Sequence, residues 1–99
     1  MRFIAFFAFV ATASATTKIF PSTHSNCNPQ DVPPIDTCGD HVLLDYDGVK
    51  GGKIVYDGQE VTWYQSIDGF GCIGESASVD TSTDCYTPPF SPSCVRIDC

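Results

Sequence analysis

Residues 55–66, VYDGQEVTWYQS, form the most regular stretch of the chain, and their pattern decides the predicted fold. Asp57-Gly58 lies between two runs of β-branched and aromatic residues. This dipeptide favours a two-residue type I′ turn, in which both central residues need a positive φ. The stretch therefore predicts a β-hairpin that pairs residues 52–56 with residues 59–63.

The two faces of this hairpin differ in polarity, because side chains alternate along a strand. Residues 41–47, HVLLDYD, alternate in the same way and predict another strand. The apolar faces of these strands give the predicted core, which consists of Val42, Leu44, Ile54, Tyr56, Val61 and Trp63. Trp63 is expected at its centre, and Tyr64 is expected to face water.

The first fifteen residues, MRFIAFFAFVATASA, have the layout of a secretory signal peptide. Arg2 is followed by an apolar run from Phe3 to Ala11, and the segment ends on Ala13-Ser14-Ala15. The apolar run is much shorter than the roughly 20 residues that a membrane-spanning helix needs. We therefore expect a secreted, extracellular protein that is cleaved after Ala15.

Six cysteines follow this segment, at positions 27, 38, 72, 85, 94 and 99. An even number of cysteines in a short exported chain predicts a disulfide framework, here of three bridges. No C-x-x-C pair is present, so a zinc site is not expected. The spacing leaves the connectivity open; Cys85–Cys94 and a bond from Cys27 to a C-terminal cysteine are candidates.

The chain after the leader divides into an arm, residues 16–37, and a disulfide-rich domain, residues 38–99. The arm shows no clear period and is rich in proline, so it is expected to be irregular. Residues 85–94 contain three prolines and predict a loop. The fold class is all-β: about five short, mostly antiparallel strands in a small sandwich or barrel.

Charge restricts the partners. The chain has 12 acidic and 5 basic residues, and its formal net charge is −7. Such a field repels nucleic-acid backbones and anionic membranes, so neither is an expected partner. It also keeps a protein soluble, and we expect a monomer.

No complete catalytic motif is present. The order His41, Glu60, Arg96 resembles that of the small guanyl-specific ribonucleases of fungi, but no histidine follows His41 to act as the general acid. The G-x-S-x-G motif of serine hydrolases is also absent. We therefore expect no catalytic residue and no cofactor; a small hydrolase, or an inhibitor of one, is the alternative.

Two kinds of binding site are suggested by single residues. Asp45, Asp47 and Asp57 lie near turns, but their spacing does not match a calcium-binding loop, so we interpret them as turn residues and expect no metal site. Tyr64, beside Glu60, offers an aromatic face and a carboxylate to a glycan.

The layout resembles the small secreted cysteine-rich proteins of filamentous fungi, many of which are effectors or antimicrobial proteins. The resemblance lies in the leader, the short acidic β-rich body and the six cysteines. It implies an effector-like virulence protein that binds a host or competitor protein without catalysis. Tyr64, Tyr86 and Phe90 are the candidate binding surface, with the alternative that Tyr86 and Phe90 form a lid over the core.

Overall fold

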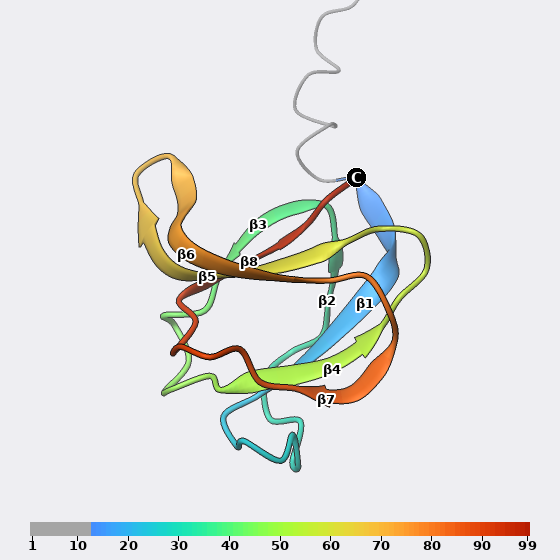
Figure 1. Cartoon of the computed structure of the whole chain (residues 1–99), viewed down its shortest axis with the longest axis horizontal. Coiled ribbons are helices and arrows are strands. Elements are labelled where there is room, and N and C mark those ends of the chain that lie inside the picture. The colour runs from blue at the N-terminus through green and yellow to red at the C-terminus, as the bar shows by residue number, and fades with distance from the viewer. Residues whose placement is uncertain (1–12) are drawn as a thin grey trace, which may run out of the picture.

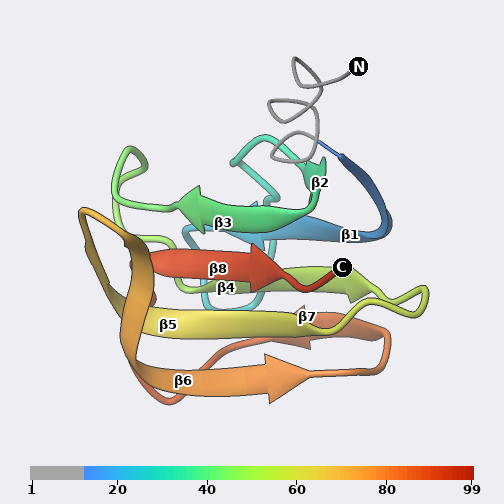
Figure 2. The same ribbon diagram turned by 90° about the horizontal axis from the view of Figure 1, so that it is seen from above.

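The protein is a β-sandwich (Figures 1 and 2). The computed structural model describes residues 13–99, and these contain eight strands and no helix: β1 Ser14–Ser22, β2 Ile35–Thr37, β3 Gly39–Val42, β4 Gly51–Val55, β5 Val61–Asp68, β6 Gly71–Val79, β7 Thr83–Tyr86 and β8 Cys94–Ile97. One antiparallel sheet has the order β2-β1-β4-β7, and the other has the order β3-β8-β5-β6. The expected all-β fold is confirmed in its sandwich form, with eight strands instead of about five.

No part of residues 13–99 forms a helix that is long and apolar enough to cross a membrane.

The predicted hairpin around Asp57-Gly58 is wrong. β4 pairs with β1 and β7, whereas β5 pairs with β6 and β8, so the two strands belong to different sheets. The turn carries the chain from one sheet to the other. It is held on β1, where Thr17 Oγ1 accepts hydrogen bonds from the backbone N–H groups of Asp57 and Gln59. Gln59 Oε1 in turn accepts a hydrogen bond from the N–H of Thr17.

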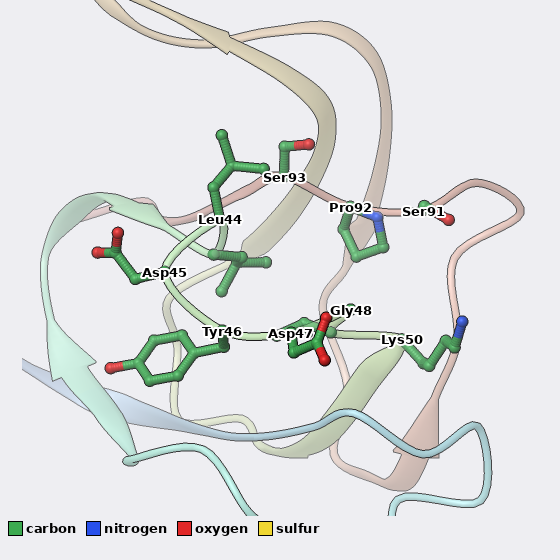
Figure 3. Close-up of a pocket in the computed structure, with 11 residues that line it drawn as sticks. Leu44, Asp45, Tyr46, Asp47, Gly48, Lys50, Ser91, Pro92 and Ser93 are labelled. Atoms are coloured by element: carbon green, nitrogen blue, oxygen red, sulfur yellow. The ribbon is translucent and has the colours of Figure 1, made fainter.

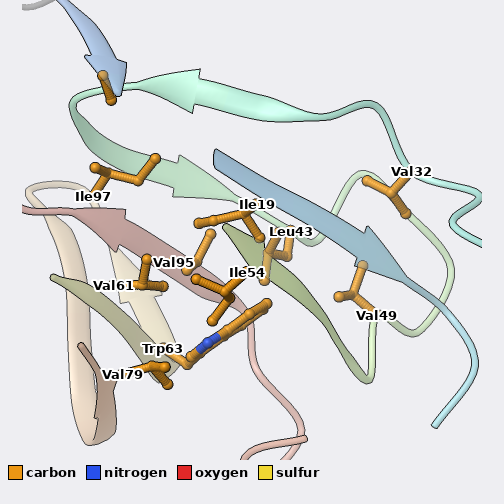
Figure 4. Packing of buried hydrophobic residues seen from close by; sticks show 11 residues of the cluster. Ile19, Val32, Leu43, Val49, Ile54, Val61, Trp63, Val79, Val95 and Ile97 are labelled. Atoms are coloured by element: carbon orange, nitrogen blue, oxygen red, sulfur yellow. The ribbon is translucent and has the colours of Figure 1, made fainter. Parts of the chain in front are cut away.

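The hydrophobic core lies between the sheets (Figure 4). Trp63, Val61 and Ile54 are fully buried there, and Tyr56 packs against them at the edge. Four of the six predicted core residues are thus in place. These four residues were assigned to the correct face of their strands because the alternation of side chains is a local property of each strand. The assignment therefore holds even though β4 and β5 are not paired.

Val42 and Leu44 are corrections to the predicted core, because they are 43% and 63% exposed. Leu43 between them is buried instead. His41 pairs with the buried Val95, so His41 points inward in β3 and its neighbour Val42 points outward. The imidazole is accommodated because its Nε2 donates a hydrogen bond to the backbone oxygen of Thr37.

The predicted irregular arm is also corrected. β1 occupies most of its first part, lies between β2 and β4, and shows the alternating burial of a strand. Its inward positions include Ala15, Thr17 and Ile19. Because Thr17 is polar, the sequence does not show an alternation of apolar residues there. Pro21 is tolerated because it lies beyond Ile19, where the pairing with β2 ends.

Three disulfides join parts of the chain that are distant in sequence: Cys27–Cys85, Cys38–Cys99 and Cys72–Cys94. The predicted three-bridge framework is confirmed. The pairing Cys85–Cys94 is wrong, because each of these cysteines bonds a different strand or loop. Cys27 bonds Cys85, which ties the segment after β1 to β7.

Candidate functional site

The β5–β6 hairpin ends in a tight turn that displays a phenylalanine. Asp68 pairs with Gly71, so Gly69 and Phe70 form the tip. The carboxylate oxygen Oδ1 of Asp68 accepts hydrogen bonds from the N–H groups of Phe70 at 2.7 Å and Gly71 at 3.1 Å. The side chain of Phe70 is 99% exposed. A large apolar side chain is therefore held in water at the end of a well-bonded turn.

The tip is fastened to the outer face of the β3-β8-β5-β6 sheet. Cys72, two residues after Phe70, bonds Cys94 of β8. The N–H of Cys72 donates to Asp40 Oδ2 of β3 at 3.0 Å. Gly71 has a φ of 135°, and a Cβ there would overlap the Asp40 carboxylate. The disulfide thus fixes the hairpin to β8, and the hydrogen bond fixes it to β3 on the far side of β8.

Asp40 and Arg96 form the polar centre of this attachment. Arg96 Nε donates to Asp40 Oδ1 at 2.5 Å, and Arg96 Nη1 donates to the hydroxyl of Tyr64 at 3.2 Å. The hydrogen bond from Arg96, helped by the N–H of Cys72, lowers the pKa of Asp40 despite the opposing effect of burial. The same ion pair raises the pKa of Arg96.

Acid should weaken this attachment. Because the pKa of Asp40 is lower in the folded protein than its ordinary value of 3.8, its contribution to stability is complete above that pH and is lost as the pH falls through the folded pKa. Asp40→Asn is expected to cost about 1 kcal/mol at neutral pH, which corresponds to a melting temperature about 5 °C lower. The difference from wild type should shrink below pH 3.8. If the difference in melting temperature between wild type and Asp40→Asn stays constant down to acid pH, the ionised carboxylate of Asp40 is not the cause of the difference.

Phe70 belongs to a larger exposed apolar set, which we call the Phe70 face: Val42, Leu44, Phe70 and Ile73. Val42 pairs with Cys94, and Cys94 bonds Cys72, which directly precedes Ile73. The ladder between β3 and β8 continues to Leu43, whose N–H donates to the oxygen of Ser93, so Leu44 follows on the same side as Val42. The disulfide joins the two segments that carry these residues.

Acidic side chains flank the Phe70 face. Asp45 follows Leu44 along the chain, Asp68 precedes Phe70 by two positions, and Glu75 follows Ile73 by two positions; all three are exposed. The positive charge of Arg96, on the same sheet, is neutralised by Asp40. The face therefore combines an apolar centre with a negative rim.

The residues predicted as a binding surface are not members of the Phe70 face. Tyr64 is on the outer face, but it is only half-exposed, and the Arg96 guanidinium lies over its ring at 5.2 Å from the centroid. Tyr86 and Phe90 are half-buried and pack against the core; the Tyr86 ring lies 6.4 Å from that of Trp63. This matches the lid alternative for Tyr86 and Phe90.

The residues considered for catalysis are not brought together. Arg96 pairs with Asp40 on the outer face of its sheet, whereas His41 pairs with Val95 on the inner face. Among residues 13–99, the one group of three possible metal ligands that converge is Asp40, Cys72 and Cys94. Its two sulfurs are joined in a disulfide, so they are not thiolate ligands.

Comparison of the chain with known protein families, with curated proteins and with solved structures gives no match.

Proposed function

We propose that the protein is a secreted, non-enzymatic binding protein that acts outside the producing cell, and that the Phe70 face is its contact surface. The full exposure of Phe70 on a fixed turn carries the proposal. An aromatic residue on a rigid support loses little conformational entropy when it is buried, and such residues dominate the energy of protein interfaces. The resemblance to fungal effector-like proteins supports a host or competitor protein as the target.

The partner should have an apolar pocket with a basic rim. Phe70 is the residue that enters the pocket, while Val42, Leu44 and Ile73 exclude water around it. Asp45, Asp68 and Glu75 would meet lysine or arginine side chains at the edge. A membrane surface fits less well, because the 12 acidic residues repel anionic lipid.

Binding should depend on Phe70. Oxidised protein is immobilised and exposed to extracellular fluid from candidate host tissue, and the captured protein is then purified and titrated. Phe70→Ser is expected to weaken binding about 30-fold or more, the effect of losing a central aromatic anchor. Because charges meet at the rim, raised salt should weaken binding as well.

Val55→Ser is the matched control for this experiment. Val55 is also an exposed apolar residue, 39% accessible, but it lies in β4 of the opposite sheet. Its replacement should leave affinity unchanged. Equal losses in the two variants would contradict the proposed surface. Phe70-dependent binding to lipid vesicles, with no protein captured, would contradict a protein partner.

We further propose that the leader is removed two residues earlier than the pattern at Ala15 suggests. Residues 1–12 lie outside the described residues, but Ser14 and Ala15 belong to β1. Ala15 is buried in this strand. Ala11-Thr12-Ala13 has the same small-x-small pattern, and cleavage after it would spare the whole strand.

N-terminal sequencing and intact mass of the exported protein should therefore show Ser14 as the first residue. A chain that starts at Thr16 would contradict this and would lack one buried residue of β1. In that case a recombinant protein starting at Ser14 should be more stable by about 1 kcal/mol.

A further inference from the structure

We propose that the hollow between the loop of residues 43–50 and the segment of residues 91–93 is a binding site for a neutral oligosaccharide (Figure 3). The hollow has a volume of about 490 Å³. Sites for small molecules in proteins measure about 300–1,000 Å³, so this one has room for a sugar unit. The hollow shares Leu44 and Asp45 with the Phe70 face and its rim, but Phe70 is not among its lining residues.

Both walls of the hollow are fixed by buried apolar side chains and by backbone hydrogen bonds, which leaves the polar side chains free. Leu43 and Val49 anchor the loop in the core at its two ends. The N–H of Leu43 donates to the oxygen of Ser93 at 2.9 Å, which joins the two walls. Within the loop, the N–H of Gly48 donates to the oxygen of Tyr46, and Gly48 has a φ of 77° that favours glycine. The site is therefore preformed.

The free side chains match the chemistry of a sugar. Asp45 and Asp47 accept hydrogen bonds from hydroxyl groups, Lys50 donates them, and Ser91 does both. Tyr46 is 37% exposed, and its ring points away from residues 91–93 (Figure 3), so it offers an apolar surface to the C–H face of a pyranose on the other side of the loop. A phosphate or carboxylate ligand is disfavoured, because two carboxylates face one ammonium group.

A second hollow, of about 310 Å³, lies on the other side of the same loop. Leu43, Asp45 and Tyr46 line both hollows, so the loop forms a ridge between them. The far wall of the second hollow includes Pro33 and Pro34. Two hollows that share one ridge suit a chain of linked sugars better than a single monosaccharide.

The test uses isotope-labelled oxidised protein and nuclear magnetic resonance. Tetramers of β-1,4-linked glucose, β-1,3-linked glucose and β-1,4-linked N-acetylglucosamine are titrated separately to millimolar concentration. At least one should shift the backbone amides of residues 43–50 and 91–93. Tyr46→Ala and Asp47→Asn should each weaken that binding about tenfold, through loss of the ring surface and of a charge-assisted hydrogen bond.

Phe70→Ser is the control, since it should leave saccharide binding unchanged while it weakens capture of the protein partner. The proposal is overturned if no tetramer shifts these amides, or if the shifts persist with equal affinity in both loop variants. It is also overturned if calcium chloride shifts the same amides and the saccharides do not, because the loop would then be a cation site.

Discussion

Replacement of Trp63 by alanine is expected to lower the free energy of unfolding by about 3–5 kcal/mol. The indole is fully buried between the sheets, and its removal leaves a cavity that the surrounding strands cannot close. Its neighbours include the Tyr86 ring, so the lid over this side of the core would lose its support. Chemical denaturation of the oxidised protein measures the effect.

Tyr64→Ala is the control for this prediction. Tyr64 is the next residue in β5, is also aromatic, and lies on the outer face, where Arg96 covers it in part. Its loss should cost only about 1 kcal/mol. If Trp63→Ala does not fold, Trp63→Phe should fold. Its free energy of unfolding should lie between that of wild type and the value expected for Trp63→Ala. Similar losses for Trp63→Ala and Tyr64→Ala would contradict the assigned faces of β5.

Gly51→Ala is expected to be at least as damaging as a core truncation, with a loss of about 3 kcal/mol or more. Gly51 begins β4, and a Cβ there would overlap the backbone oxygen of Tyr86 at the end of β7. Gly52 is similarly crowded on the other side, where a Cβ would lie 2.6 Å from the backbone oxygen of Phe20 in β1. Backbone atoms cannot rotate away, so the strands would have to separate.

Gly69→Ala provides the comparison. Gly69 is exposed at the tip of the β5–β6 hairpin, and a Cβ there would meet no atom within 4 Å. Its replacement should change stability by less than about 0.5 kcal/mol. Thermal unfolding of the two variants side by side distinguishes the close approach of strands from a general cost of losing glycine. Equal melting temperatures of Gly51→Ala and Gly69→Ala would contradict the close approach of strands at Gly51.

The sequence predicted the faces of strands better than their partners. Ile54, Val61 and Trp63 were assigned to the core correctly, because the alternation of side chains depends only on the strand itself. The predicted hairpin around Asp57-Gly58 was wrong, because β4 pairs with β1 and β5 pairs with β8, and both partners are distant in sequence. Local turn preference does not contain that information.

Polar groups at inward positions explain two further errors. Thr17 is fully buried in β1, where its hydroxyl bonds the backbone of the crossing turn, so the strand lacked an apolar period. His41 faces inward in β3 and reversed the expected phase of Val42 and Leu44. Both side chains are satisfied by hydrogen bonds to distant backbone, which a sequence pattern does not reveal.

The Phe70 face was missed, although part of its signal was present. Asp68 and Gly69 are residues that favour a turn, and a phenylalanine at the tip of a tight turn has few neighbours to bury it. The other members were hidden because Val42 and Leu44 had been assigned to the core. The joining of these segments depends on the Cys72–Cys94 bond, which the spacing of cysteines did not predict.

The position of β8 has a consequence for the order of folding. Among the strands of residues 13–99 this one is the last in sequence, yet it lies between β3 and β5 and joins them in their sheet. A growing chain that has not yet delivered residues 94–97 leaves both strands with open hydrogen-bonding edges. Nearly the whole polypeptide must therefore emerge before the β3-β8-β5-β6 sheet can close, and folding should be slow and dependent on distant contacts.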